Sequence, residues 1–165
     1  MDDILIKFQE VIDEEIKAYE KLGELYKLKQ SILVQRKVDA LWDVDAQIIK
    51  EAEDIKSINK KRKDVGKYLG DENITLSAVI EKARKSNDDL ANKMENQKTK
   101  LKILSKSIAL QEKTIMTLIK HGLVMVGKTL DIIVGVISPH SKQYNQKGHN
   151  IDMDKSMISS IVEEV

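Results

Sequence analysis

The first part of the chain repeats apolar side chains at heptad spacing. Counting in sevens from Leu5, or from Ile4, meets an apolar or aromatic residue at each of five successive positions. Apolar residues spaced in this way lie on one face of an α-helix and form a seam for a neighbouring helix. The pattern therefore predicts a long amphipathic helix over residues 3–34, packed on other helices along its length.

A second helical pattern follows a short interruption at residues 35–38. Asp39 is expected to be the N-cap, and apolar residues recur at spacings of three and four over residues 39–69. A connection this short between two long helices predicts an antiparallel hairpin. Trp42 and Ile49 lie on an adjacent stripe, where we expect contact with a third helix.

The rest of the chain contains two more helical patterns. Gly70 suits a C-terminal helix cap, and Thr75 or Ser77 can cap a short helix over residues 76–84. A third long pattern covers residues 90–137 and becomes steadily more apolar until Pro139 ends it.

The predicted fold class is all-α. We expect an elongated antiparallel helical bundle or coiled coil of three long helices plus one short helix over residues 1–137. Residues 138–165 are predicted to form a mobile C-terminal tail, since their first half is polar and rich in turn residues. Apolar residues from Met153 to Val165 recur at helical spacing, which is compatible with a short amphipathic helix.

Composition narrows the class of protein further. A third of the residues are charged and 4% are aromatic, with one Phe, one Trp, one Pro and no Cys. This balance suits long helices and excludes disulfides and thiolate metal sites. A net charge of +1 provides no overall field for nucleic acid. We see no secretory signal and no apolar run long enough to enter a membrane, so a cytoplasmic location is expected.

One stretch of the third long pattern matches a nucleotide-binding motif, Gly122-x-x-x-x-Gly127-Lys128-Thr129. A phosphate-binding loop places the amides of small residues around the phosphates, after a strand and before a helix. Here the four intervening residues, Leu123 to Val126, are bulky and apolar, and the preceding sequence is helical in pattern. We therefore favour the alternative, in which this stretch is the apolar end of a long helix that receives a partner.

Other signals of chemistry are weak. The residues His121, His140 and His149 do not occur at metal-ligand spacing, and no Glu-x-x-His motif is present. We predict no catalytic residues, no metal and no cofactor, and therefore no enzyme activity.

The segment from Lys56 to Lys67 holds six basic residues. It is either a patch for nucleic acid or anionic lipid, or a solvated helix face balanced by acidic residues of the first helix. We favour the second interpretation, because no aromatic residues are interleaved with the basic ones. The acidic residues expected to balance them are Asp13, Glu14, Glu15 and Glu20.

The layout of the chain resembles the FlgN family of flagellar export chaperones. The resemblance includes the long first helix, the short junction Lys37-Val38-Asp39-Ala40-Leu41 and the basic segment Ile58-Asn-Lys-Lys-Arg62. It continues with the restart at Thr75-Leu76-Ser77, a long last helix and the turn Tyr144-Asn-Gln-Lys-Gly148. The chain departs from the family pattern at Ile58-Asn59, where a Leu-Glu step is common.

The resemblance implies a cytoplasmic chaperone for type III export. Such a protein binds C-terminal helical segments of flagellar hook-associated proteins, prevents their premature assembly and delivers them to the export apparatus, whose gate is a further partner. A helix laid on an apolar surface is the expected mode of recognition. The residues predicted to bind the partner are Leu123, Val126, Leu130, Ile133, Ile137, Tyr144, Met157 and Ile161.

A second hypothesis stays open. The heptad regularity of residues 3–34 also suits a structural or regulatory coiled-coil module without a client, and a homodimer is compatible with either function.

Overall fold

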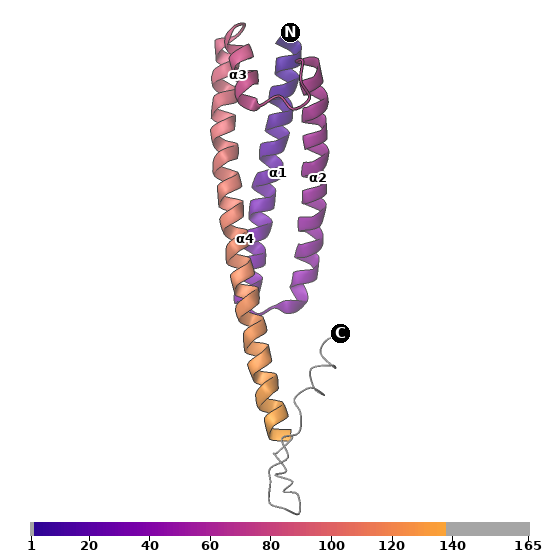
Figure 1. The fold of residues 1–165 in the computed structure, drawn as a ribbon, viewed down its shortest axis with the longest axis vertical. Coiled ribbons are helices and arrows are strands. Elements are labelled where there is room, and N and C mark those ends of the chain that lie inside the picture. Colours follow the sequence, from indigo (N-terminus) through magenta and orange to yellow (C-terminus); the bar gives the residue numbers. More distant parts are fainter. Residues whose placement is uncertain (1, 138–165) are drawn as a thin grey trace, which may run out of the picture. The chain divides into compact units, whose positions relative to one another are not determined.

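The computed structural model describes residues 2–137, and their side chains as far as residue 135. This part of the chain is helical and contains no strand, so the all-α prediction is confirmed. The elements are α1 (Asp2–Val34), the 3₁₀-helix η1 (Val38–Ala40), α2 (Leu41–Tyr68), α3 (Leu76–Arg84) and α4 (Asp88–Ile137) (Figure 1). The predicted tail, residues 138–165, lies outside the described residues.

The turn between α1 and α2 is tight. The amides of Arg36 and Lys37 donate to the carbonyl oxygens of Leu33 and Ile32, both at 3.1 Å. This pair of bonds is a Schellman motif, and it requires Arg36 to adopt a left-handed conformation with φ of 58°. The motif closes the last turn of α1 and reverses the chain.

The helix caps at the other junctions agree only in part with those predicted from the sequence. The Thr75 hydroxyl accepts a hydrogen bond from the Ala78 amide at 3.2 Å, and Gly70 has a φ of +101°, as expected. The prediction of Asp39 as an N-cap was wrong. The 3₁₀-helix η1 occupies that junction, so the residue at the N-cap of α2 is Ala40, which makes no side-chain cap.

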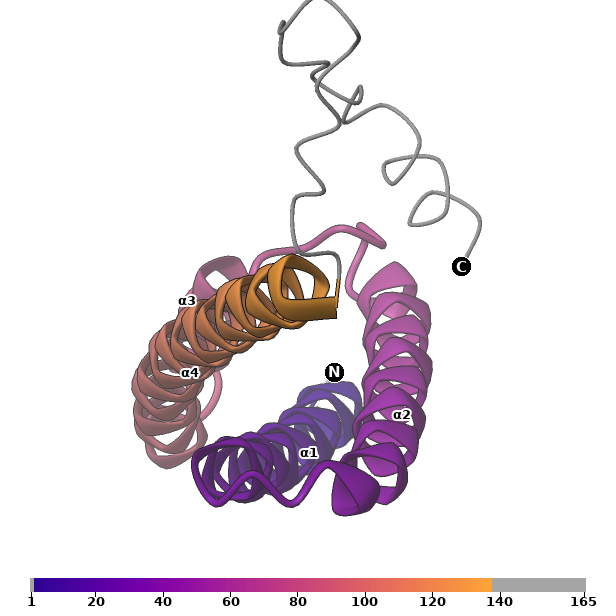
Figure 2. The ribbon, with the colours of Figure 1, turned by 90° about the horizontal axis from the view of Figure 1, so that it is seen from below.

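Helix α1 lies between α2 and α4 (Figures 1 and 2). Pairing of Glu14 with Lys61, and of Lys29 with Asp45, shows that α2 runs antiparallel to α1. Residue numbers rise together on α1 and α4, where Gln9 contacts Lys93 and Tyr26 contacts Glu112. Helix α4 therefore runs parallel to α1 and antiparallel to α2.

The core of the bundle is densest near the start of α1. There, Leu5, Phe8 and Ile12 are completely buried against α3 and the first turns of α4. A second cluster joins Val11, Ala18 and Leu22 to α2 and to Ile108 of α4. Burial of these side chains is the main contribution that holds the helices together.

The outer face of α2 differs from the expectation. Trp42 and Ile49 were predicted to meet a third helix, but both side chains are exposed. Val44, Ile55 and Ile58 form the buried side of α2 instead. Because α1 covers only that side, the adjacent stripe has no helical neighbour among the described residues.

The chain divides into two units, Met1–Gly122 and Leu123–Val165. The first contains the packed helices α1 to α3 and most of α4. The described part of the second is the last stretch of α4, residues 123–137. The domain boundary placed at residue 137 from the sequence stays a prediction.

Candidate functional site

Helix α4 supplies the candidate site, and its start is well defined. The Asn87 side chain accepts a hydrogen bond from the Leu90 amide at 3.1 Å, and Asp88 and Asp89 occupy the first turn. Both features favour helix initiation, since they satisfy free amides and carry negative charge at the positive end of the helix dipole. From this start the helix continues for 50 residues.

Within the bundle, α4 packs on α1 through a single apolar stripe. Met94, Ile108 and Ile115 of this stripe are buried, the last two with 8% and 5% of their surface exposed. Hydrogen bonds between the two helices join residues that are 84 to 88 positions apart. Because α1 ends at Val34, this register extends along α4 no further than about Gly122.

The stripe nevertheless continues in the sequence. After Ile115 it proceeds at spacings of four, four, three, four and three through Ile119, Leu123, Val126, Leu130 and Ile133. These spacings keep the side chains on one face of the helix. We call Leu123–Val134 the apolar end of α4.

Side chains of the apolar end are exposed. The exposed fractions are 67% for Leu123, 57% for Val126, 54% for Leu130 and 45% for Ile133. These four were predicted from the sequence to bind a partner, and the structure brings them together on one helix face. Contiguous exposed apolar surface of this kind marks an interaction site more often than an isolated exposed Leu does.

The other predicted binding residues fall beyond the described side chains. Ile137 is the last residue of α4, but its side chain lies outside the described part. Tyr144, Met157 and Ile161 also lie outside the described residues.

Further exposed apolar residues of the apolar end were not predicted. Val124, Met125, Ile132 and Val134 are all at least 40% exposed and extend the surface to other sides of the helix. The signal that could have identified them is the nearly unbroken apolar run itself, which is broader than one stripe.

Charge is sparse in the apolar end, where Lys128 and Asp131 are the only ionisable residues. A Cβ atom added at Gly122, Gly127 or Gly135 would meet no atom outside its own stretch of helix within 4 Å. A partner can therefore approach the backbone closely at these points.

The nucleotide-binding motif is part of this helix. Gly122 to Thr129 lies wholly within α4, and the Thr129 hydroxyl donates to the Met125 carbonyl at 2.9 Å. In a continuous helix each amide already donates to the carbonyl four residues earlier, so these amides cannot surround a phosphate. The structure therefore does not support the phosphate-binding loop.

The basic segment of α2 is partly neutralised by α1, as expected. Lys61 pairs with Glu14 at 2.9 Å, and the Arg62 guanidinium donates to both carboxylate oxygens of Glu15. The prediction was wrong for Asp13 and Glu20, because these residues face α4. Asp13 accepts a hydrogen bond from Gln97, and Glu20 pairs with Lys100 at 2.6 Å.

Glu15 and Tyr26 are among the ionisable groups of α1 whose pKa values are shifted. Burial raises the pKa of the Glu15 carboxyl above its usual value of 4.5, while the Arg62 charge opposes the shift. Burial, followed by the hydrogen bond to Glu112, raises the pKa of Tyr26 to about 12. Tyr26 therefore stays protonated near neutral pH and donates to Glu112 at 2.7 Å.

Residues 2–137 show little that indicates other chemistry. They contain no group of three or more His, Asp or Glu side chains arranged to hold a metal ion. No helix in the same range is long and apolar enough to span a membrane.

Comparison with known families gives one match. The profile of the family described as FlgN protein matches residues 1–150 of this chain. No curated protein and no solved structure matches it.

Proposed function

The chain belongs to the FlgN family of flagellar export chaperones, and from this premise we propose that it binds C-terminal helical segments of hook-associated proteins. In this proposal the chaperone works in the cytoplasm, covers the segment before assembly and delivers it to the type III export apparatus, including its gate.

The observation that carries the proposal is the exposure of the apolar end of α4. The stripe whose side chains are buried at Ile108 and Ile115 continues through Leu123, Val126 and Leu130, whose side chains are exposed. A surface that already suits one amphipathic helix suits a second one of similar pattern. A client helix would therefore cover the exposed apolar side chains of the stripe.

Recognition of this kind allows release without nucleotide hydrolysis by the chaperone. A dissociation constant of about 1 μM corresponds to about 8 kcal/mol, which is enough for holding and weak enough for exchange. The binding set also includes Ile137, Tyr144, Met157 and Ile161, which are proposed on sequence grounds alone.

The test compares two faces of α4. The variant L123S/V126S/L130S is expected to weaken binding of a C-terminal hook-associated segment by about a hundredfold, because three apolar contacts are lost. The control I103S/L110S alters side chains on the same helix that are equally exposed but lie within the bundle stretch. Binding is measured by calorimetry, and circular dichroism checks that both variants stay helical.

Two outcomes would contradict the proposal. Either the wild-type protein shows no association with such segments at tens of micromolar, or the control loses as much affinity as the stripe variant. In the first case, with self-association seen in sedimentation, the structural coiled-coil hypothesis would be favoured. Deleting residues 138–165 tests the part assigned to the tail, since its removal should weaken client binding and leave the bundle folded.

A further inference from the structure

The bundle stretch of α4 carries a second surface that the client-binding proposal does not use. Lys102, Lys106, Lys113 and Lys120 follow one another at spacings of four, seven and seven residues. Such spacings place side chains on one side of a helix, over a length of about 27 Å. We call these four residues the lysine row.

The lysine row contrasts with the lysines just before it on α4, because its charges are unpaired within the described residues. Lys93, Lys98 and Lys100, just before it on α4, all form ion pairs with nearby carboxylates. None of the four lysines in the row pairs with a described residue, and all four are exposed. The one acidic residue between Lys102 and Lys120 is Glu112, which accepts the hydrogen bond from Tyr26 of α1.

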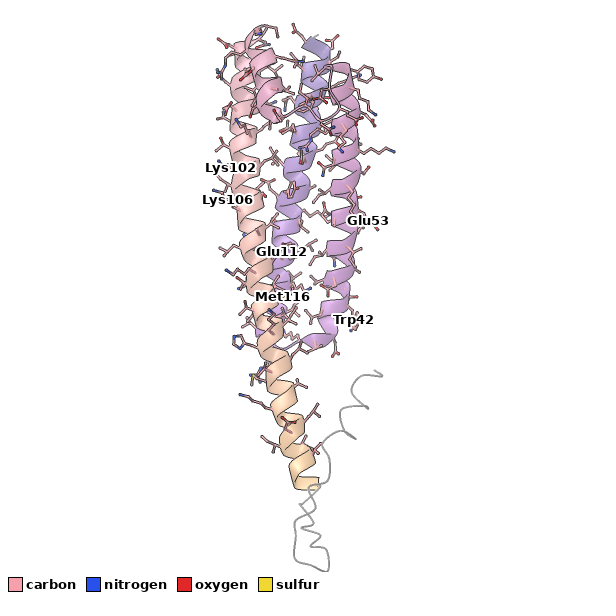
Figure 3. All side chains as sticks on the ribbon, in the orientation of Figure 1. Trp42, Glu53, Lys102, Lys106, Glu112 and Met116 are labelled. Atoms are coloured by element: carbon pink, nitrogen blue, oxygen red, sulfur yellow. The ribbon has the colours of Figure 1, made fainter. Side chains whose placement is uncertain are left out.

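The geometry of α4 explains this difference. Figure 3 shows that Lys102 and Lys106 point away from α1, on the outer side of α4. The acidic residues of α1 lie on the other side of α4, where Asp13 and Glu20 are already engaged by Gln97 and Lys100. The positive charge of the row is therefore local, although the chain as a whole has a net charge of only +1.

An apolar strip accompanies the row. Ile103 and Leu110 are spaced by seven residues, and their side chains are 62% and 67% exposed. Seven residues correspond to two helical turns, so both side chains project from the same side of α4. The surface thus combines two apolar contacts with a parallel line of positive charge.

We propose that this surface binds an acidic amphipathic helix of another protein. The apolar seam of that helix would cover Ile103 and Leu110, and carboxylates on one flank would lie opposite the lysine row. The heptad spacing of these residues on α4 matches the spacing of the apolar seam positions, and of the positions beside the seam, on a second amphipathic helix. Charge complementarity along the flank fixes the orientation of the partner.

The composition of this face argues against other anionic partners. Residues 91–120 contain no Arg and no aromatic residue, which single-stranded nucleic acid would need for stacking. Binding to an anionic membrane by an amphipathic helix needs a broad apolar face that can enter the lipid, whereas the apolar strip beside this row consists of two large side chains.

The experiment uses the full chain and a designed probe. The probe is a fluorescein-labelled helical peptide of three heptads, with Leu along its seam and Glu on one flank, and binding is followed by anisotropy. The variant K102E/K106E/K113E is expected to weaken binding by about tenfold or more, because attraction becomes repulsion. A probe with Lys in place of Glu should bind this variant more tightly than it binds the wild type.

Matched controls separate this surface from general charge and from the client site. The variant K50E/K56E/K60E reverses three exposed lysines of α2 that form no ion pair with a described residue, and it should bind the probe within about twofold of wild type. The stripe variant L123S/V126S/L130S should also keep its affinity for the probe. If the variant K102E/K106E/K113E loses probe binding and keeps client binding, the loss is specific to the lysine row.

Three results would overturn the inference. One is equal weakening by the α2 control, and another is failure of the Lys probe to prefer the reversed variant. The third is tighter binding of the wild type to phosphatidylserine vesicles or to a single-stranded oligonucleotide than to the acidic probe. Circular dichroism of each variant confirms that the helices are retained.

Discussion

Two stretches of the same helix carry similar apolar residues in different surroundings. In the bundle stretch of α4, Ile108 and Ile115 are buried, and Ile108 packs against side chains of α1 and α2. In the apolar end, Leu123 and Leu130 occur at the same kind of spacing and are more than half exposed. The spacing of apolar residues is thus the same in both stretches, whereas the burial of their side chains differs.

Polar contacts differ between the two stretches in the same way. The bundle stretch is joined to α1 by Lys93, Gln97, Lys100 and Glu112. The apolar end contains only Lys128 and Asp131 as ionisable residues, and neither forms an ion pair with a described residue. The same kind of helix face is thus buried in one stretch and exposed in the other.

The largest expected effect is on core packing. Met94→Ala removes a completely buried side chain and should lower the free energy of unfolding by about 2–5 kcal/mol. Leu130→Ala removes an exposed one and should change it by less than about 0.5 kcal/mol. Urea denaturation followed by circular dichroism measures both, and similar losses in the two variants would show that the apolar end is covered in solution.

Glycine substitutions should have opposite signs in the two units. A Cβ at position 66 would lie 2.9 Å from the backbone oxygen of Asp71, so Gly66→Ala should destabilise the bundle by about 1–3 kcal/mol. A Cβ at position 127 meets nothing within 4 Å, so Gly127→Ala should stabilise the local helix by about 1 kcal/mol. Hydrogen exchange of α2 and α4 amides reads out each change, and faster exchange in Gly127→Ala would contradict the open environment.

Removal of a single charge should have different effects on stability in the bundle and in the apolar end. Arg62→Ala leaves the buried Glu15 carboxylate without its partner and should cost about 1–3 kcal/mol of stability. Lys128→Ala in the apolar end removes an unpaired exposed charge and should be neutral within about 0.5 kcal/mol. The comparison fails if thermal unfolding shows the two variants to be equally destabilised.

The smallest expected effect is on the dependence of stability on pH. Burial raises the pKa of Glu15 above 4.5, so the folded protein holds this proton more tightly than the unfolded chain does. The contribution of Glu15 to stability should therefore fall as the pH rises from about 4.5 through its folded pKa. Glu15→Gln should flatten this part of the profile, measured by urea unfolding at a series of pH values, and an unchanged profile would assign the dependence to other groups.

Local features of the fold followed well from the sequence because they depend on neighbouring residues. Thr75 caps α3 and Gly70 takes a positive φ, as their residue types predict. Asp39 was the exception, since the chain makes a 3₁₀ turn there and the residue before α2 is Ala40. The chain could begin α2 with a cap at Asp39 or with a 3₁₀ turn. Which of the two forms depends on how the hairpin between α1 and α2 closes, and the residue type at position 39 does not specify this.

Spacing in the sequence is not sufficient to tell a buried stripe from an exposed one. Spacing places Leu123, Val126 and Leu130 on one face, yet the same spacing describes Ile108 and Ile115, which are buried. The lysine row shows the same limit. Spacing places Lys100 and Lys102 on different sides of α4, but it does not show that Lys100 pairs with Glu20 of α1 while Lys102 points away from α1 without a described partner.

By itself, the sequence determined that the chain is helical, where each long helix begins and ends to within about two residues, and which side chains share a face. These properties depend on interactions within a few turns, which residue type and spacing describe directly. Only the tertiary structure decided that α1 lies between α2 and α4 within the first unit, and that Asp13 and Glu20 contact α4 rather than α2. Those outcomes depend on which helices are adjacent and in what register. The spacing of apolar residues predicts which face of a helix is buried, but not which helix packs against that face.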